Sequence, residues 1–120
     1  MSEGLSFLPS PELAIVIPAW NERENLELLL PALRETLDGL RASWEIIVVD
    51  GGSSDGTAEA AVRRGARVVR QQMRGYGGAL LAGFAATSAP WMITMDADCS
   101  HRPIFIEELW RRRSEAEVLI

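Results

Sequence analysis

Two aspartates separated by a single alanine, Asp96 and Asp98, are the residues of this chain whose types and spacing best fit metal chemistry. They follow the apolar run 91–95, which is typical of a buried strand. In extended backbone, residues i and i+2 project to the same face, so both carboxylates could reach one cation. Mg²⁺ prefers hard oxygen ligands and takes the remainder from water and phosphate. The pair indicates a divalent-metal site for a phosphorylated ligand; the plainer alternative is a solvated turn.

Residues 50–57 are a second polar segment with chemical potential, Asp-Gly-Gly-Ser-Ser-Asp-Gly-Thr. They have the form of a strand end, a tight turn and a helix start, where backbone N–H groups can meet an anion. The alternative is structural: Asp55 or Thr57 caps a helix and the glycines shape the turn. Both interpretations stay open for residues 53–57, whereas the functional one is favoured for Asp50.

Arg74 and the pair Trp20 and Glu22 complete the set of candidates. Arg74 precedes three glycines and could hold a phosphate through its guanidinium group, or the segment could be a flexible loop that enters a helix. Trp20 and Glu22 lie where the first strand ends, so the indole could stack on a base and the carboxylate could bind ribose or a base edge. The alternative for this pair is packing at the rim and a favourable charge at a helix N-terminus.

The apolar spacing predicts alternating strands and helices. We expect strands at residues 13–17, 45–49, 67–70, 91–95 and 117–120, and helices at about 21–37, 57–64, 78–86 and 103–114. Asn21 and Glu24 form a capping-box-like pair at the start of the first helix, and Pro31 should kink or divide it. Gly65 is a natural residue to end the second helix. The first helix should bury one stripe of leucines, Leu26, Leu29, Leu30, Leu33 and Leu37.

This order predicts an α/β fold with a Rossmann-like, mostly parallel sheet and helices on both faces, joined by right-handed crossovers. Such sheets bind ligands at the carboxyl ends of their strands. All four polar segments follow predicted strands, so we expect the fold to gather them on one rim. Residues 1–12 are expected to form a flexible leader. Because the sequence stops inside a predicted strand, we expect it to be the front portion of a longer protein.

Composition, charge and the lack of certain motifs argue against several classes of function. A net charge of -5 and a pI near 4.9 disfavour a nucleic-acid-binding surface, which needs clustered cations. No run approaches the roughly 20 apolar residues of a membrane span. Leu80 stands where G-x-G-x-x-G would need its third glycine, which disfavours a dinucleotide-binding dehydrogenase. Cys99 and His101 alone are a poor zinc signal.

Four ordered motifs, at residues 17–22, 48–57, 74–79 and 95–101, resemble those of family 2 glycosyltransferases. The most similar branch is the polyprenyl-phosphate (dolichol-phosphate) mannosyltransferases. The resemblance covers residues 13–120 and implies that this segment is the nucleotide-sugar-binding half of a GT-A fold, incomplete at its C-terminus. It also implies a Mg²⁺ or Mn²⁺ cofactor.

The resemblance assigns roles to particular residues. It implies that Asp98 binds the metal with Asp96 beside it, that Asp96 contacts ribose, and that Asp50 lies beside the base. The residues it implies for nucleotide-sugar binding are Pro18, Trp20, Glu22, Asp50, Gly51, Asp96 and Ala97. Two positions depart from the family pattern. Gly51 stands where many relatives carry an acid that approaches the base, and Trp20 replaces a tyrosine.

The resulting hypothesis is an inverting transferase that moves mannose from GDP-mannose to a polyprenyl phosphate. We expect it to act peripherally at the cytoplasmic face of the membrane. A metal on Asp98 would neutralise the leaving nucleoside diphosphate, and Arg74 would add to that stabilisation. The alternatives are a UDP-glucose-dependent transferase with a lipid or saccharide acceptor, and a module that only binds a nucleotide sugar.

Overall fold

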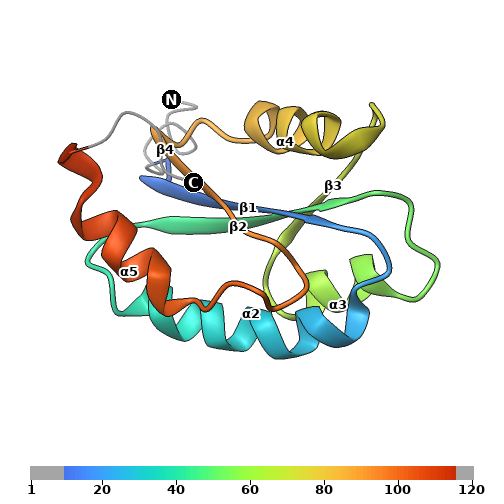
Figure 1. Cartoon of the computed structure of the whole chain (residues 1–120), viewed down its shortest axis with the longest axis horizontal. Coiled ribbons are helices and arrows are strands. Elements are labelled where there is room, and N and C mark those ends of the chain that lie inside the picture. The colour runs from blue at the N-terminus through green and yellow to red at the C-terminus, as the bar shows by residue number, and fades with distance from the viewer. Residues whose placement is uncertain (1–9, 116–120) are drawn as a thin grey trace, which may run out of the picture.

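The computed structural model describes residues 10–115, which form a sheet of four strands between helices (Figure 1). The strands are β1 (Leu13–Ala19), β2 (Trp44–Asp50), β3 (Arg67–Arg70) and β4 (Trp91–Thr94). The helices are α2 (Arg23–Asp38), α3 (Thr57–Arg63), α4 (Gly75–Ala85) and α5 (Ile104–Arg111), followed by the 3₁₀ turn η1 (Arg113–Glu115). The strand predicted at 117–120 and residues 1–9 of the predicted leader lie outside the described residues.

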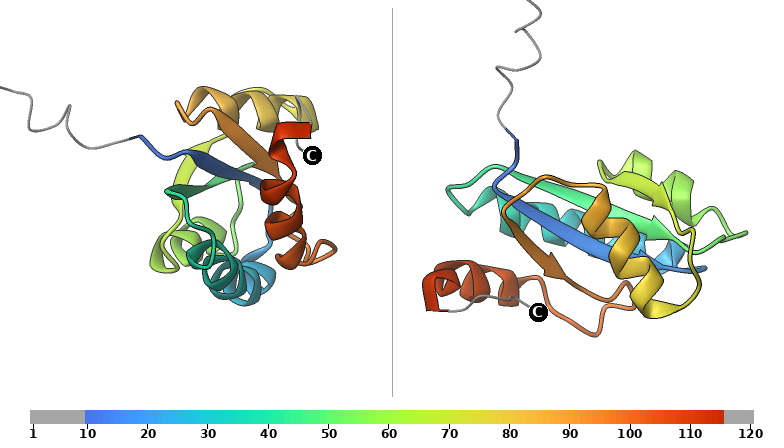
Figure 2. Two further views of the ribbon diagram at one scale, coloured as in Figure 1. Left: turned by 90° about the vertical axis from the view of Figure 1, so that its left-hand side faces the viewer. Right: turned by 90° about the horizontal axis from the view of Figure 1, so that it is seen from above.

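The sheet has the order β3-β2-β1-β4, and every pair of neighbouring strands is parallel. α4 covers one face, whereas α2 and α3 cover the other, and α5 packs against α2 beside the β4 edge (Figures 1 and 2). β1 is buried on both faces: Leu13, Ile15 and Ile17 face α2, and Ala14 and Val16 face α4. The predicted α/β fold with a parallel sheet and helices on both faces is confirmed.

β1 continues two residues past its predicted end, through Pro18 to Ala19, where it still pairs with β2. A proline in a central strand normally costs a ladder hydrogen bond. Backbone groups of successive residues point to opposite sides of a strand, so those of residues 16 and 18 point to the same side, and the Val16 carbonyl accepts from the Met95 N–H on the β4 side. The N–H that Pro18 lacks would point to that same side, beyond the end of β4. The sheet therefore loses nothing at this position.

The predicted capping box at the start of α2 is wrong. α2 begins at Arg23, and no side chain of its own N-terminal turn caps it. The Asn21 side-chain oxygen instead accepts from the Ser54 N–H at 2.9 Å, and the Arg23 N–H donates to Asp55 Oδ2 at 3.2 Å. The N-terminus of α2 is thus satisfied from the loop after β2, a partner 32 residues away in the sequence.

The body of α2 follows the sequence prediction more closely. All five leucines of the predicted stripe are buried. The helix runs unbroken across Pro31, so the prediction that this proline could divide it is wrong. α3 ends one residue before its predicted end, and Gly65, at φ +88°, takes the left-handed conformation expected after a helix.

α4 begins three residues earlier than predicted, so Tyr76 and the glycines after it form its first turn instead of a loop. Its inner face is made of small residues. A methyl group added at Gly83 would overlap the Val16 Cγ1 atom of β1, so glycine allows this close approach of helix and strand. This contact brings α4 close to β1.

The Asp-x-Asp pair does not lie in extended backbone. β4 ends at Thr94, although the Met95 N–H still donates to β1, and Ala97 and Asp98 form a turn that ends before α5. The prediction that both carboxylates project from one strand face is therefore wrong. α5 begins at Ile104 after Pro103 and ends at Arg111, three residues before its predicted end. Among residues 10–115, no helix is long and apolar enough to cross a membrane.

Candidate nucleotide-sugar site

Two adjoining hollows open at the carboxyl ends of the strands. The first, which we call the base cavity, measures about 460 Å³ and lies between the end of β1 and the start of α4. It is lined by Pro18, Ala19, Trp20, Glu22, Gly51, Gln71, Gly75, Tyr76 and Ala79. The second, the acid cavity, measures about 310 Å³ and lies between β4 and α5. Tyr76 lines both, and we call the two hollows together the recess.

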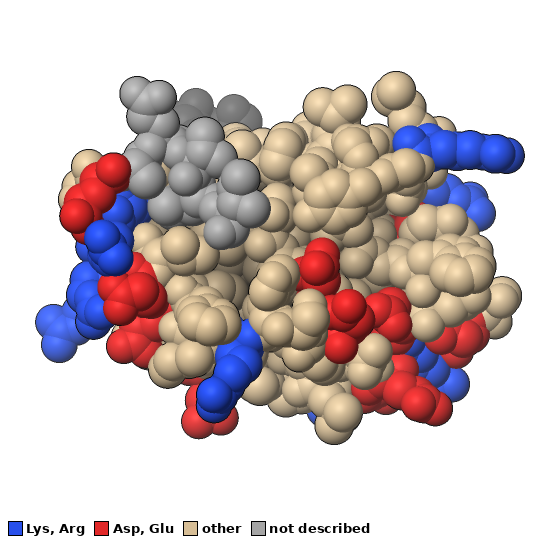
Figure 3. All heavy atoms as spheres, viewed as in Figure 1, with Lys and Arg blue, Asp and Glu red and all other residues tan. Residues whose placement is uncertain are grey.

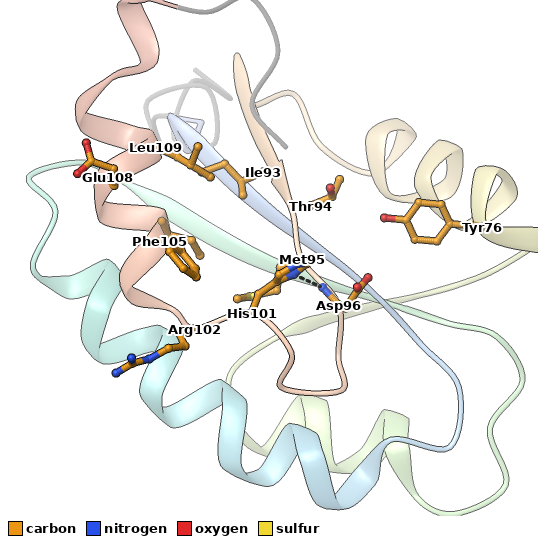
Figure 4. Close-up of a pocket in the computed structure, with 11 residues that line it drawn as sticks. Tyr76, Ile93, Thr94, Met95, Asp96, His101, Arg102, Phe105, Glu108 and Leu109 are labelled. Carbon is orange, nitrogen blue, oxygen red and sulfur yellow. Dashed lines mark hydrogen bonds between the residues drawn. The ribbon is translucent and has the colours of Figure 1, made fainter.

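The acid cavity has apolar walls and a few polar groups. Phe105 and Leu109 of α5 and Ile93 of β4 form one side, and Tyr76 of α4 lies opposite them (Figure 4). The Asp96 carboxylate points into the space toward α4, and the Tyr76 hydroxyl is directed toward the same space (Figure 4). A half-buried carboxylate beside an apolar wall can bind a hydroxyl group or a cation.

Side-chain hydrogen bonds connect the loop after β1, residues 20–22, to the loop after β2, residues 51–56. The Asn21 N–H donates to Ser53 Oγ at 2.8 Å and the Glu22 N–H donates to Thr57 Oγ1 at 3.0 Å. Thr57 is fully buried, and its hydroxyl also bonds Asp55. Residues 53–57 therefore use their polar groups on the protein, which favours the structural interpretation of this segment.

Asp55 lies at the centre of this hydrogen-bond network. Its carboxylate accepts from the Thr57 hydroxyl and from the backbone N–H groups of Thr57 and Arg23. The hydrogen bond from the Thr57 side chain, reinforced by these N–H groups, lowers the pKa of Asp55 below its ordinary value of 3.8. The anion thus holds the starts of α2 and α3 together.

The predicted site residues divide between the recess and its surroundings. The structure brings Pro18, Trp20, Glu22 and Gly51 together in the base cavity, and Asp96 lines the acid cavity. Asp50 lines neither hollow, because its carboxylate turns to accept from the Ser53 N–H at 3.1 Å. Arg74 is exposed just before α4 and also lines neither. Ala97 is buried under the turn that carries Asp98.

The two acids of the Asp-x-Asp pair suit a divalent cation that also binds phosphate. Asp98 is exposed, and its Oδ1 accepts from the Ser100 N–H at 2.9 Å. Hydrogen bonds from the Ser100 side chain and backbone lower the pKa of Asp98, so the carboxylate stays charged. No cluster of three or more acidic, histidine or cysteine side chains among residues 10–115 could enclose a metal alone. A hard cation held by one or two carboxylates and completed by ligand oxygens fits this donor set.

Cys99 and His101 do not add metal ligands to this pair. The Cys99 thiol donates to the Asn25 carbonyl, and burial with the nearby charges of Asp98 and Glu22 raises its pKa. A thiol held in its protonated form is a poor zinc ligand. His101 Nδ1 lies 3.5 Å from the Asp96 N–H, at the limit of a hydrogen bond.

Acidic side chains gather in the centre of the face shown in Figure 3, between α4 and α2, whereas the surface over α4 on this face carries almost no charge. A diphosphate that approached this acidic face alone would be repelled. A bound divalent cation would make the local electrostatic potential positive. An anionic ligand would therefore bind at these acidic side chains together with a metal ion.

Gln71 and Tyr76 are among the residues of the recess that sequence reasoning missed. Gln71 directly follows β3, and the rule that strand ends carry the site would have found it. Tyr76 was placed in a loop because the glycines on both sides of it obscured the start of α4. The early start of the helix is what turns the ring into the recess.

A parallel α/β sheet with hollows at the carboxyl ends of its strands is typical of a nucleotide-binding domain. The family model "Glycosyl transferase family 2" matches residues 14–119, and the chain belongs to this family. The predicted family membership is confirmed.

Known relatives agree with this assignment. The chain is 32% identical over 114 residues to the undecaprenyl-phosphate 4-deoxy-4-formamido-L-arabinose transferase of Salmonella choleraesuis, with 89% of this chain covered. The crystal structure of glucosyl-3-phosphoglycerate synthase from Mycobacterium tuberculosis with Mn²⁺, UDP and glucosyl-3-phosphoglycerate superposes with a TM-score of 0.73. That match has 29% identity and covers 86% of this chain. The same synthase has also been crystallised with Mg²⁺ and UDP.

The chain spans 35% of the length of the arabinose transferase and 39% of the length of the synthase. In both relatives, most of the protein lies outside the matched segment. The fold and the family are therefore established for this chain, and its reaction is taken up as a proposal.

Proposed function

We propose that this chain forms the donor-binding part of a metal-dependent, inverting glycosyltransferase that transfers a hexose from a nucleoside diphosphate sugar to a polyprenyl phosphate. The observation that carries the proposal is that Tyr76 lines both the base cavity and the acid cavity, into which the Asp96 carboxylate points. A nucleotide sugar needs an elongated site with a stacking surface at one end and a cation at the other. Trp20, which is 65% exposed, offers the first, and the Asp-x-Asp turn offers the second.

Asp98, with Asp96 beside it, would hold Mg²⁺ or Mn²⁺ in this enzyme, as the donor set indicates. When bound, the cation supplies charge neutralisation for the departing diphosphate. Arg74 stands at the start of α4, where its guanidinium group can add a second positive charge. Crystal structures of the synthase relative that contain Mn²⁺ or Mg²⁺ together with UDP support this assignment.

In the proposed reaction, an acceptor phosphate oxygen bonds to the anomeric carbon while the bond from that carbon to the donor phosphate oxygen breaks. The nucleoside diphosphate departs with the electron pair, and the anomeric configuration inverts. A phosphate acceptor is ionised near neutral pH, so this step needs no strong protein base. The undecaprenyl-phosphate relative supports a lipid phosphate as the acceptor, and such a lipid would keep the enzyme at the membrane surface, on the cytoplasmic side.

The donor is the part of the proposal with two candidates. GDP-mannose follows from the resemblance to dolichol-phosphate mannosyltransferases. UDP-glucose gains support from the synthase relative, which has been crystallised with UDP-glucose and Mn²⁺. The two nucleotides differ in the base, which the cavity around Trp20 and Gly51 would contact.

The test has two parts. Calorimetric titration of GDP-mannose and UDP-glucose, with and without Mn²⁺, should show metal-dependent binding of one donor. Radiolabelled donor mixed with undecaprenyl phosphate in detergent should then yield a labelled lipid. Folded protein that binds neither donor would refute the nucleotide-sugar site. Binding without transfer would support the second candidate function, a module that binds a nucleotide sugar without turning it over.

A further inference from the structure

Gln71 is a residue of the base cavity whose side chain is held in one orientation. Its Nε2 donates to the Met73 carbonyl at 2.6 Å and to the Gly75 carbonyl at 2.9 Å. Carbonyl oxygens accept only, so the amide nitrogen must face both of them. The two N–H donors of the side chain are thereby committed, and Oε1 is left as its acceptor.

That oxygen lies beside the missing side chain of Gly51. A Cβ atom added at Gly51 would stand 3.3 Å from Gln71 Oε1 and 3.6 Å from Trp20 Cβ. Any larger residue at position 51 would therefore crowd the space between Gln71 and Trp20. Within residues 10–115, no N–H or O–H group donates a hydrogen bond to Oε1. Glycine at position 51 thus leaves one acceptor open to the cavity, next to an exposed indole.

A single fixed acceptor distinguishes between nucleobases. Uracil presents one N–H group, at N3, between two carbonyl oxygens. Guanine presents N1–H and the N2 amino group side by side, and this pair is matched by a carboxylate with two oxygens. The Gln71 amide nitrogen already donates both of its hydrogens to the protein, so only Oε1 is left to bind a base. This oxygen can accept from the single N–H of uracil, but guanine would keep one of its two donors without a partner. An unmatched polar group in a binding site costs affinity.

We propose that Gln71 is the residue that determines base specificity, and that its Oε1 accepts a hydrogen bond from the N3–H of a uracil that stacks on Trp20. This inference rests on the proposed nucleotide-sugar site and specifies its donor as a uridine nucleotide. In this chain, a side chain from the end of β3 takes over the contact that a residue at position 51 would otherwise supply.

The test compares two ligands in two proteins. UDP and N3-methyl-UDP, which lacks the donor, are titrated calorimetrically with Mn²⁺ into the wild-type protein and into Gln71→Met. Methionine has nearly the length of glutamine but offers no comparable acceptor. The wild type should bind UDP roughly fivefold to tenfold more tightly than N3-methyl-UDP. Gln71→Met should bind UDP more weakly by a similar factor and lose most of that preference.

Other outcomes overturn the inference in distinguishable ways. If Gln71 only holds the segment 73–75, Gln71→Met should weaken both ligands equally and keep the preference. A wild type that binds GDP more tightly than UDP would overturn the uracil assignment and leave the proposed function intact. A wild type that binds neither nucleotide would overturn the proposed function itself. The comparison of the two ligands in wild-type protein stays informative even if the variant folds poorly.

Discussion

The two sides of the recess are built differently. On one side, four hydrogen bonds link residues 21–23 to residues 53–57. Next to the acid cavity, the turn that carries Asp98 has a local bond from the Ser100 N–H to Asp98 and one distant contact, from the Cys99 thiol to the Asn25 carbonyl. The first side therefore uses its polar groups on itself, and the second leaves charged oxygens exposed. Such a division suits a site in which a preformed wall receives the base and a cation organises the rest.

The largest expected effect concerns the open side. Asp98→Ala should weaken metal-dependent nucleotide binding by roughly a hundredfold or more, because even outer-shell partners of a metal are commonly worth 10-fold to 100-fold in affinity. Its melting temperature should hardly change, since Asp98 is exposed and bonds only its own turn. Titration with and without Mn²⁺ measures the first effect, and calorimetric melting measures the second. Asp38→Ala, which removes an exposed acid at the end of α2, is the matched control.

Substitutions in the hydrogen-bonded side, residues 21–23 and 53–57, should instead lower the stability of the fold. Thr57→Val removes the hydroxyl that accepts from the Glu22 N–H and leaves that donor without its partner. We expect a loss of about 2 kcal/mol in the free energy of unfolding, measured by urea denaturation. Thr57→Ser keeps the hydroxyl and should recover most of that stability. Equal stability of Thr57→Val and wild type would contradict the idea that these hydrogen bonds hold the two loops together.

A smaller effect should appear at low pH. The pKa of Asp55 is lowered in the folded state, so its carboxylate contributes stability that is fully present above its ordinary pKa of 3.8. That contribution is lost as the pH falls through the lowered value. The difference in melting temperature between wild type and Asp55→Asn should therefore be constant from pH 5 to 7 and shrink below about pH 3.8. A difference independent of pH would exclude the charge of Asp55 as its source.

The sequence was most informative where local chemistry decides the structure. The β-branched apolar runs predicted the strands, and Gly65 marked the end of α3 because few other residues adopt its backbone angles readily. Asn21 misled because Ser54, distant in the sequence, competes for its oxygen. The rim was predicted from strand ends alone, but the turn at Ala97 and the early start of α4 decide which side chains enter the recess. These choices depend on tertiary contacts that spacing does not encode.

The close approach of α4 to β1 has a consequence for the two hollows at the strand ends. Gly75 and Tyr76 stand at the first turn of this helix and line the recess, whereas Gly83 meets Val16 near its other end. Because a helix is stiff, the contact at Gly83 governs how high the far end stands over the strands. A methyl group at position 83 would push this end of the helix away from β1. The packing of α4 on β1, and with it the position of the Tyr76 ring that lines both hollows, thus depends on a glycine at the other end of the helix.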